Sequence, residues 1–109
     1  MKLYSYWRST AAYRVRIALN IKGIEHIIKP VHLVKNGGEQ LQQAYKSINP
    51  QSLVPALETD NGDVLTQSLA IIDYLEEQFP ENSLYPKDLI QKSQAKAMAL
   101  SIACDIHPL

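Results

Sequence analysis

Two adjacent hydroxyl side chains, Ser9 and Thr10, stand where a tyrosine-rich extended segment meets a segment with helical periodicity. The first turn of a helix has unpaired backbone N–H groups, and the helix dipole adds positive charge at the same end. Such an end stabilises anions, including a thiolate brought by a ligand. An unspecified serine at such a junction is more commonly an ordinary helix cap. The junction is therefore either a simple cap or a site for an anionic ligand.

Two later positions offer backbone groups to a ligand. Pro55 interrupts the apolar run 53–57, and proline is normally confined to an edge strand or to the start of a strand. The run therefore either fails as a strand or begins one at a special bond. Ser68 opens the helical segment 68–79, so it can cap that helix, and the free N–H groups beside Gln67 and Ser68 can hold a carboxylate.

Three arginines lie close to the hydroxyl pair. Arg8 immediately precedes it and is the best placed to attract an acidic substrate. Arg14 and Arg16 are two residues apart on the predicted helix, so they point to different faces. At least one of them is therefore expected to be a surface residue or a structural ion-pair partner.

Composition narrows the classes of protein. The 109 residues suit one compact domain with a core of ordinary size. Eleven basic residues balance eleven acidic ones, so no overall field favours nucleic acid or an anionic membrane. Cys104 is the single cysteine, which excludes an intrachain disulfide and any Cys-x-x-Cys redox or zinc motif. No segment is typical of a signal peptide or a membrane span, so we expect a cytoplasmic protein.

The first predicted elements form a β-α-β unit. A strand over 2–6 leads into a helix over 10–22 that Gly23 ends, and a second strand follows over 26–31. This order implies parallel strands. The helix carries one apolar stripe that should face the sheet. Its predicted members are Val15, Ala18 and Leu19, widened by Ile17 and Ile21.

The following elements complete the order βαβαββα. A short polar helix is predicted over 39–48, followed by two antiparallel strands near 53–57 and 64–66 that a turn at 60–63 joins. The helix over 68–79 is the clearest of the chain, because its apolar residues share one face. These residues are Ile71, Ile72, Leu75 and Phe79.

A family signature covers the junction between the first strand and the first helix. Residues 9–19, STAAYRVRIAL, closely resemble the pattern Ser-Ser-Cys-x-Trp-Arg-Val-Arg-Ile-Ala-Leu of zeta-class glutathione transferases. Ser9 and every residue from Arg14 to Leu19 match. Thr10, Ala11 and Tyr13 replace the second Ser, the Cys and the Trp. The resemblance implies a thioredoxin-like α/β domain that binds glutathione.

The same resemblance implies an activity. It is the glutathione-dependent cis-trans isomerisation of 4-maleylacetoacetate to 4-fumarylacetoacetate, in the breakdown of tyrosine and phenylalanine. The implied cofactor is glutathione, and the implied substrate is a small dicarboxylic keto acid. A homodimer is implied, and no metal, nucleic acid or membrane takes part.

The resemblance also assigns roles to individual residues. The hydroxyl of Ser9, or of Thr10 beside it, donates to the glutathione sulfur and lowers a thiol pKa that is ordinarily about 8.5. Ala11 cannot repeat the chemistry of the family cysteine. The other expected glutathione contacts are Gln40, Val54, Pro55, Gln67, Ser68 and His107.

Two of these contacts are implied to use the backbone. The Val54-Pro55 bond resembles the cis-proline of the thioredoxin superfamily, which turns the preceding backbone outward so that Val54 pairs with the cysteinyl part of glutathione. The N–H groups at Gln67 and Ser68 are implied to hold the γ-glutamyl carboxylate.

The chain is predicted to divide into three parts. Residues 1–80 form the thioredoxin-like glutathione-binding domain, 81–88 a linker, and 89–109 the start of an incomplete all-helical domain whose first helix runs over 89–104. Family members are roughly twice as long. We therefore expect the isolated chain to show little or no turnover.

Two other functions use the same residues. A glutathione transferase that conjugates or dehalogenates small electrophiles would keep Ser9 and the same glutathione pocket. A non-catalytic interaction module built on the transferase fold would bind glutathione weakly. A glutaredoxin-like redox function is rejected, because Ser9 stands where the redox cysteine would be and no cysteine precedes Cys104.

Overall fold

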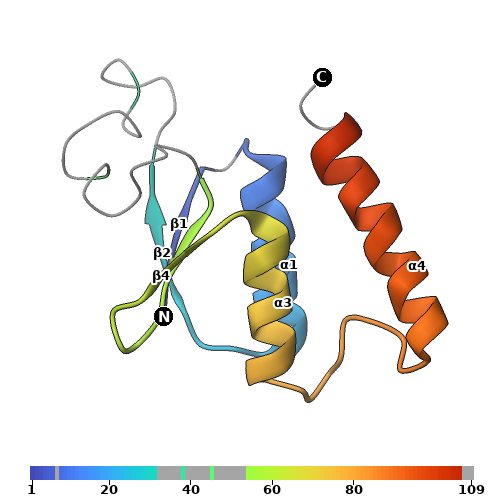
Figure 1. The fold of residues 1–109 in the computed structure, drawn as a ribbon. Helices are drawn as coiled ribbons and strands as arrows, with labels where there is room; N and C mark the ends of the chain where they lie inside the picture. The colour runs from blue at the N-terminus through green and yellow to red at the C-terminus, as the bar shows by residue number, and fades with distance from the viewer. Residues whose placement is uncertain (7, 32–37, 39–44, 46–53, 107–109) are drawn as a thin grey trace.

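The sheet has four strands in the order β2-β1-β3-β4 (Figure 1). The computed structural model describes residues 1–6, 8–31, 38, 45 and 54–106. Residues 104–106 are described by their backbone alone. The strands are β1 (Lys2–Ser5), β2 (Ile27–Pro30), β3 (Ala56–Glu58) and β4 (Val64–Thr66). β2 is parallel to β1, whereas β3 is antiparallel to both β1 and β4. The predicted β-α-β unit and hairpin are confirmed.

β2 forms one edge of the sheet and ends at Pro30. The Ile27 N–H donates to the Met1 carbonyl at 3.0 Å, and the Val31 N–H donates to the Ser5 carbonyl at 2.9 Å. All four residues of the strand are exposed. The second predicted strand is therefore confirmed with slightly shorter bounds.

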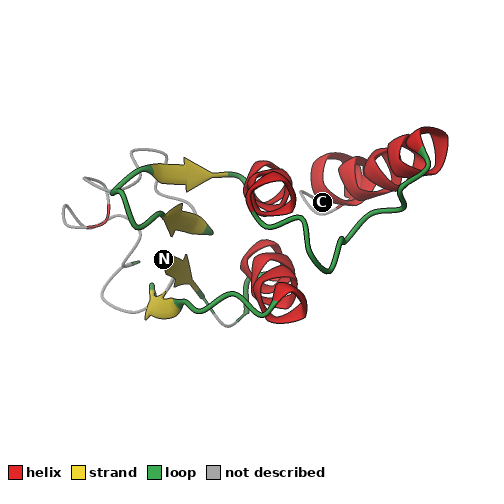
Figure 2. Ribbon diagram, turned by 90° about the horizontal axis from the view of Figure 1, so that it is seen from below, coloured by secondary structure: helices red, strands yellow, loops and turns green. Residues whose placement is uncertain are grey.

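Helices α1 (Thr10–Lys22) and α3 (Ser68–Gln78) cover one face of the sheet (Figure 2). Successive residues of a strand point to opposite faces, and Leu3 and Ser5 of β1 are both buried. Sheet and helices enclose one core, made of Leu3, Val15, Ala18, Leu19, Leu57, Ile71, Ile72 and Leu75. The predicted apolar face of α3 is confirmed, with Phe79 partly buried at its border.

The predicted stripe of α1 is correct at its centre and wrong at its margin. Ile17 and Ile21 do not widen it, since their side chains are 41% and 53% exposed. With 3.6 residues per turn, these two positions lie on the side of the helix opposite Val15 and Leu19. Gly23 ends α1 as predicted, in the left-handed conformation with φ 66°.

A smaller apolar cluster contains Val31, Tyr45 and Ala56. The ring of Tyr4 packs against it, with its centroid 5.6 Å from that of Tyr45. Tyr45 is the one described residue of the helix predicted over 39–48, and it is helical. The other positions of that helix lie outside the described residues.

Helix α4 (Leu89–Leu100) follows the segment after α3. Asp88 caps it, because its carboxylate accepts from the Gln91 N–H at 3.0 Å. The chain continues as a π-helical segment, Ser101–Ile106, so the predicted helix over 89–104 is confirmed but changes type near its end. Among the described helices, none has the length and apolar character needed to cross a bilayer.

Candidate functional site

Ser9 joins β1 to α1 and caps the helix. Its backbone is extended (φ −77°, ψ 117°), and its Oγ accepts from the Ala12 N–H at 3.1 Å. A hydroxyl has one O–H donor and two acceptor lone pairs. The cap uses a lone pair, so the O–H proton remains available to a ligand. The capping role and the proposed donor role of Ser9 are therefore compatible.

The start of α3 is built differently. Ser68 was predicted to cap this helix, and that prediction is wrong. Gln67 occupies the cap position without a side-chain cap bond, and Ser68 is the first helical residue. The Ser68 Oγ instead accepts from Arg14 Nη1 at 2.9 Å. A side chain of α1 has taken the hydroxyl that the sequence pattern assigned to α3.

Gln67 also has an unusual backbone. Its φ is 70° and its ψ is 121°, a combination that residues with a Cβ rarely adopt. Such a conformation persists only where the surrounding structure determines it, and it is frequent at ligand sites. It directs the chain from β4 into the first turn of α3.

The N-terminal ends of the two helices lie at the end of the sheet where β1 and β4 finish. In Figure 1, α1 and α3 run in the same direction, and both begin near the end of β1. Neither helix has an acidic residue in its first turn. The positive ends of the two helices therefore lie close together, and no acidic residue of either first turn neutralises them. This arrangement favours a ligand that carries negative groups. Ser9, Thr10, Gln67 and Ser68 are the predicted site residues at these two ends.

The Val54-Pro55 peptide bond is cis, as predicted. Pro55 is buried and Val54 partly exposed, and β3 begins at the next residue. Of the two alternatives that the sequence left open for the run 53–57, the second is correct, because a short strand begins directly after this bond. Whether the Val54 backbone pairs with a ligand stays a prediction.

The three arginines have separate environments. Arg8 is exposed in the turn before Ser9. Arg14 reaches α3, whereas Arg16 lies over the ring of Tyr13 with its guanidinium carbon 5.2 Å from the ring centroid. The prediction that Arg14 and Arg16 point to different faces is confirmed.

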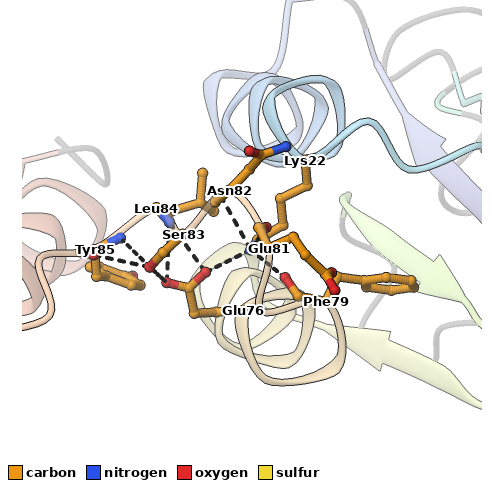
Figure 3. Close-up of polar contacts among 8 residues, drawn as sticks. All are labelled: Lys22, Glu76, Phe79, Glu81, Asn82, Ser83, Leu84 and Tyr85. Carbon is orange, nitrogen blue, oxygen red and sulfur yellow. Dashed lines mark hydrogen bonds and ion pairs between the residues drawn. The ribbon is translucent and has the colours of Figure 1, made fainter.

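The opposite ends of the same helices hold a buried cation. Lys22 Nζ forms an ion pair with Glu76 Oε1 at 2.7 Å and donates to the Phe79 carbonyl at 2.6 Å. It also approaches the carbonyls of Glu81 and Asn82, at 3.3 and 3.5 Å (Figure 3). The Lys22 side chain is fully buried. A cation is favourable here because carbonyls and the negative ends of both helices surround it.

Glu76 extends this cluster into the segment after α3. Its carboxylate accepts from the Ser83 hydroxyl at 2.6 Å and from the Leu84 N–H at 3.1 Å (Figure 3). Partial burial acts to raise the pKa of Glu76, but the bonds from Lys22, Ser83 and Leu84 outweigh it and lower the pKa to about 2. The carboxylate is therefore ionised at neutral pH, and it ties the segment after α3 to both helices.

Arg14 and Lys22 are residues that the sequence analysis did not single out for these roles. Arg14 and Arg16 flank the buried stripe of α1 on its two sides, so the sequence alone did not indicate which of them reaches α3. Lys22 lies on the stripe itself, four residues from Ala18, and its period matches the core. Reading that period without regard to charge would have predicted its burial.

Two predicted contacts, Gln40 and His107, lie outside the described residues. Among the residues that are described, no group of three His, Cys, Asp or Glu side chains could hold a metal ion.

Similar proteins place this arrangement in a family. Residues 8–78, more than half of the chain, match the family model described as glutathione S-transferase, N-terminal domain. The chain is 50% identical over 109 residues to a maleylacetoacetate isomerase of Pseudomonas aeruginosa, of which it covers 51%. The chain thus spans about half the length of the curated relatives that it matches.

Solved structures agree with the sequence match. A bacterial maleylpyruvate isomerase described as a zeta-class glutathione S-transferase superposes with a TM-score of 0.91 at 49% identity, over 99% of this chain and 50% of that one. A maleylacetoacetate isomerase from Methylobacterium extorquens AM1, solved with malonate and glutathione, gives 0.90 at 48% identity, over 100% and 50%. The chain therefore belongs to the glutathione S-transferase family, with zeta-class members among its relatives.

Proposed function

We propose that this chain is the glutathione-binding part of an enzyme that isomerises 4-maleylacetoacetate to 4-fumarylacetoacetate. The observation that carries the proposal is Ser9, which caps α1 through a lone pair and keeps its O–H proton for a ligand sulfur. Relatives with about 50% sequence identity that are named for this reaction support the proposal.

The residues present fit glutathione. Bound glutathione supplies a thiolate that adds reversibly to the double bond, so that the carbon-carbon bond can rotate before the sulfur leaves. Ser9 donates a hydrogen bond from its hydroxyl to that sulfur, with Thr10 beside it, and the positive end of α1 favours the ionised form. The N–H groups at Gln67 and Ser68 hold the γ-glutamyl carboxylate.

The remaining roles complete the proposal. Val54, after which the chain turns at the cis bond to Pro55, pairs its backbone with the cysteinyl part of glutathione. Arg8 attracts the dicarboxylic substrate, while Gln40 and His107 contribute polar contacts to glutathione.

The organisation of the whole protein belongs to the same proposal. Residues 1–80 bind glutathione, 81–88 form a linker, and 89–109 begin an all-helical domain. The enzyme acts in the cytoplasm as a homodimer. The family match over residues 8–78 and the start of α4 at Leu89 support the domain bounds.

The direct test is turnover of 4-maleylacetoacetate by the full-length protein with glutathione, without it, and with S-methylglutathione. The last compound keeps the binding groups but cannot supply a thiolate. We expect isomerisation with glutathione alone. Turnover without glutathione, or equal turnover with the methylated compound, would contradict the proposal.

A second substrate has specific support. A relative of 49% identity is named maleylpyruvate isomerase, and a maleyl group again contains a cis double bond. Comparing kcat/KM for the two substrates decides between them. Conjugation of a haloacid or another electrophile, or weak glutathione binding without any turnover, would instead favour the transferase or the non-catalytic module.

A further inference from the structure

Arg14 connects the two helices whose N-terminal ends form the proposed site. It lies in the second turn of α1, and its Nη1 donates to the Ser68 Oγ at 2.9 Å. Ser68 is buried, with 7% of its surface exposed, and is the first residue of α3. The bond therefore joins the body of one helix to the first turn of the other.

This bond replaces the usual means of fixing a helix start. A capping side chain normally bonds to N–H groups of the first turn. At α3 the cap residue, Gln67, makes no such bond. The first turn is held from the side instead, by a guanidinium whose planar fork loses little freedom when it bonds.

We propose that Arg14 is a positioning residue for glutathione. Through Ser68 it holds the first turn of α3 so that its N–H groups face the γ-glutamyl carboxylate. This inference rests on the proposed function. Arg14 acts at the carboxylate end of the ligand, so its loss weakens binding and leaves the ionisation of the sulfur, which depends on Ser9, unchanged.

The chain supplies a matched control. Arg16 is an arginine on the same helix, two residues away, and it stacks on Tyr13 instead of reaching α3. Replacing either arginine by glutamine removes one positive charge and keeps a polar side chain of helix-compatible shape. A general effect of charge would appear in both variants, whereas an effect of the Ser68 contact would appear only in Arg14→Gln.

The experiment measures two quantities on the full-length protein. One is the dissociation constant of S-methylglutathione, and the other is the pKa of bound glutathione, followed by thiolate absorbance. A lost charge-assisted hydrogen bond should make Arg14→Gln bind about tenfold more weakly. The thiol pKa should stay unchanged, and Arg16→Gln should bind within about twofold of the wild type. Equal weakening in both glutamine variants, or a shifted pKa with unchanged affinity, would overturn the inference.

A second set of variants covers the case in which Arg14→Gln folds poorly. Ser68→Ala removes only the acceptor of the bond, and Arg14→Lys keeps the charge without the fork. We expect each of these two variants to bind S-methylglutathione more weakly. The double variant Arg14→Lys/Ser68→Ala should bind no more weakly than the single variant with the lower affinity, because the two substitutions remove the same hydrogen bond. Additive losses would show that Arg14 does not act through Ser68.

The outcomes separate this inference from the proposed function. A wild-type protein that does not bind S-methylglutathione would overturn both. A wild-type protein that binds it, together with an Arg14→Gln variant of equal affinity and equal thiol pKa, would overturn the role of Arg14 alone.

Discussion

The two ends of the α1 and α3 pair solve opposite electrostatic problems. At the C-terminal ends, where helix dipoles are negative, the chain supplies its own cation, Lys22, and surrounds it with a carboxylate and carbonyls. At the N-terminal ends, where dipoles are positive, neither first turn contains an acidic residue. The protein itself supplies the opposite charge at the C-terminal ends, and we propose that a ligand supplies it at the N-terminal ends.

This difference separates what stabilises the fold from what serves the site. Lys22 and Glu76 join α1 to α3 through an ion pair whose lysine side chain is fully buried, and Glu76 also accepts from Ser83 in the segment after α3. The Ser9 cap lies within the first turn of α1, and the Arg14 to Ser68 bond joins α1 to the first turn of α3. Changes at the Lys22 end should therefore alter stability, and changes at the Ser9 end should alter ligand chemistry.

The largest expected effect is on stability, from Lys22→Met. Methionine fills the space of the buried lysine stem but removes the donor that Lys22 provides to the Glu76 carboxylate and to several carbonyls. We expect a loss of about 3–5 kcal/mol in the free energy of unfolding, the range for breaking one partner of a buried pair. Urea denaturation measures it.

Lys2→Met is the control for this loss. Lys2 pairs with Glu58 at 3.7 Å on the surface, so its removal should change stability by less than about 1 kcal/mol. Similar losses in the two variants would mean that the buried cluster is no more important than a surface pair.

The next effect is on chemistry, from Ser9→Ala and Ser9→Gly. Both remove the hydroxyl donor, so both should lower isomerase turnover about 100-fold, as when one donor to a developing charge is lost. Glutathione affinity should stay within a few-fold. Glycine is a better cap than alanine by several tenths of a kcal/mol or more, so only stability should distinguish the variants.

The matching readout is the pKa of bound glutathione. It should rise equally in both Ser9 variants. An unchanged pKa would move the donor role to Thr10 or to the backbone, and a turnover that followed stability would leave Ser9 as a cap alone.

A third effect depends on pH and concerns Glu76. Its pKa falls from 4.5 in the unperturbed state to about 2 in the folded protein, so the unfolded chain binds its proton more readily. The resulting stabilisation, about 1–3 kcal/mol, is fully present above pH 4.5 and is lost as the pH falls through 2. Denaturation of the wild type and Glu76→Gln at pH 7, 4 and 2 should give a difference that shrinks toward acid. A constant difference would contradict this role.

The smallest expected effect is a change in stability at two residues with positive φ, one near each end of the α1 and α3 pair. Asn82, at φ 54°, belongs to a residue type that tolerates this region, whereas Gln67 does not. Gln67→Gly should stabilise the protein by about 0.5–1 kcal/mol, and Asn82→Gly should be close to neutral. Thermal unfolding measures both. Equal shifts would show that Gln67 holds no strain.

Periodicity predicted the elements because each buries one face. Val15, Ala18 and Leu19 repeat at helical spacing, and Gly23 is a residue that adopts the left-handed stop without a steric penalty. Ile17 and Ile21 misled the prediction, because apolar type alone does not tell which side of a helix meets the sheet.

The site was predictable only where it depends on local sequence. A cap such as Ser9 bonds within its own turn, so its position follows from neighbouring residues. Ser68 and Lys22 are bonded by residues more than fifty positions away, and those partners decided their roles. A local pattern at Ser68 could not reveal that an arginine from another helix would take its hydroxyl.

The edge strand β2 bears on how copies of this chain meet. Ile27 and Val31 direct their N–H groups to β1, so the alternating groups of Ile28 and Pro30 face outward. Proline has no N–H, so the N–H of Ile28 is the single outward donor of β2. The charged side chain of Lys29 lies between Ile28 and Pro30. A strand of a neighbouring chain therefore could not form a regular series of backbone hydrogen bonds with β2. Growth of a continuous intermolecular sheet from this edge is disfavoured, even though Ile27 and Ile28 are exposed.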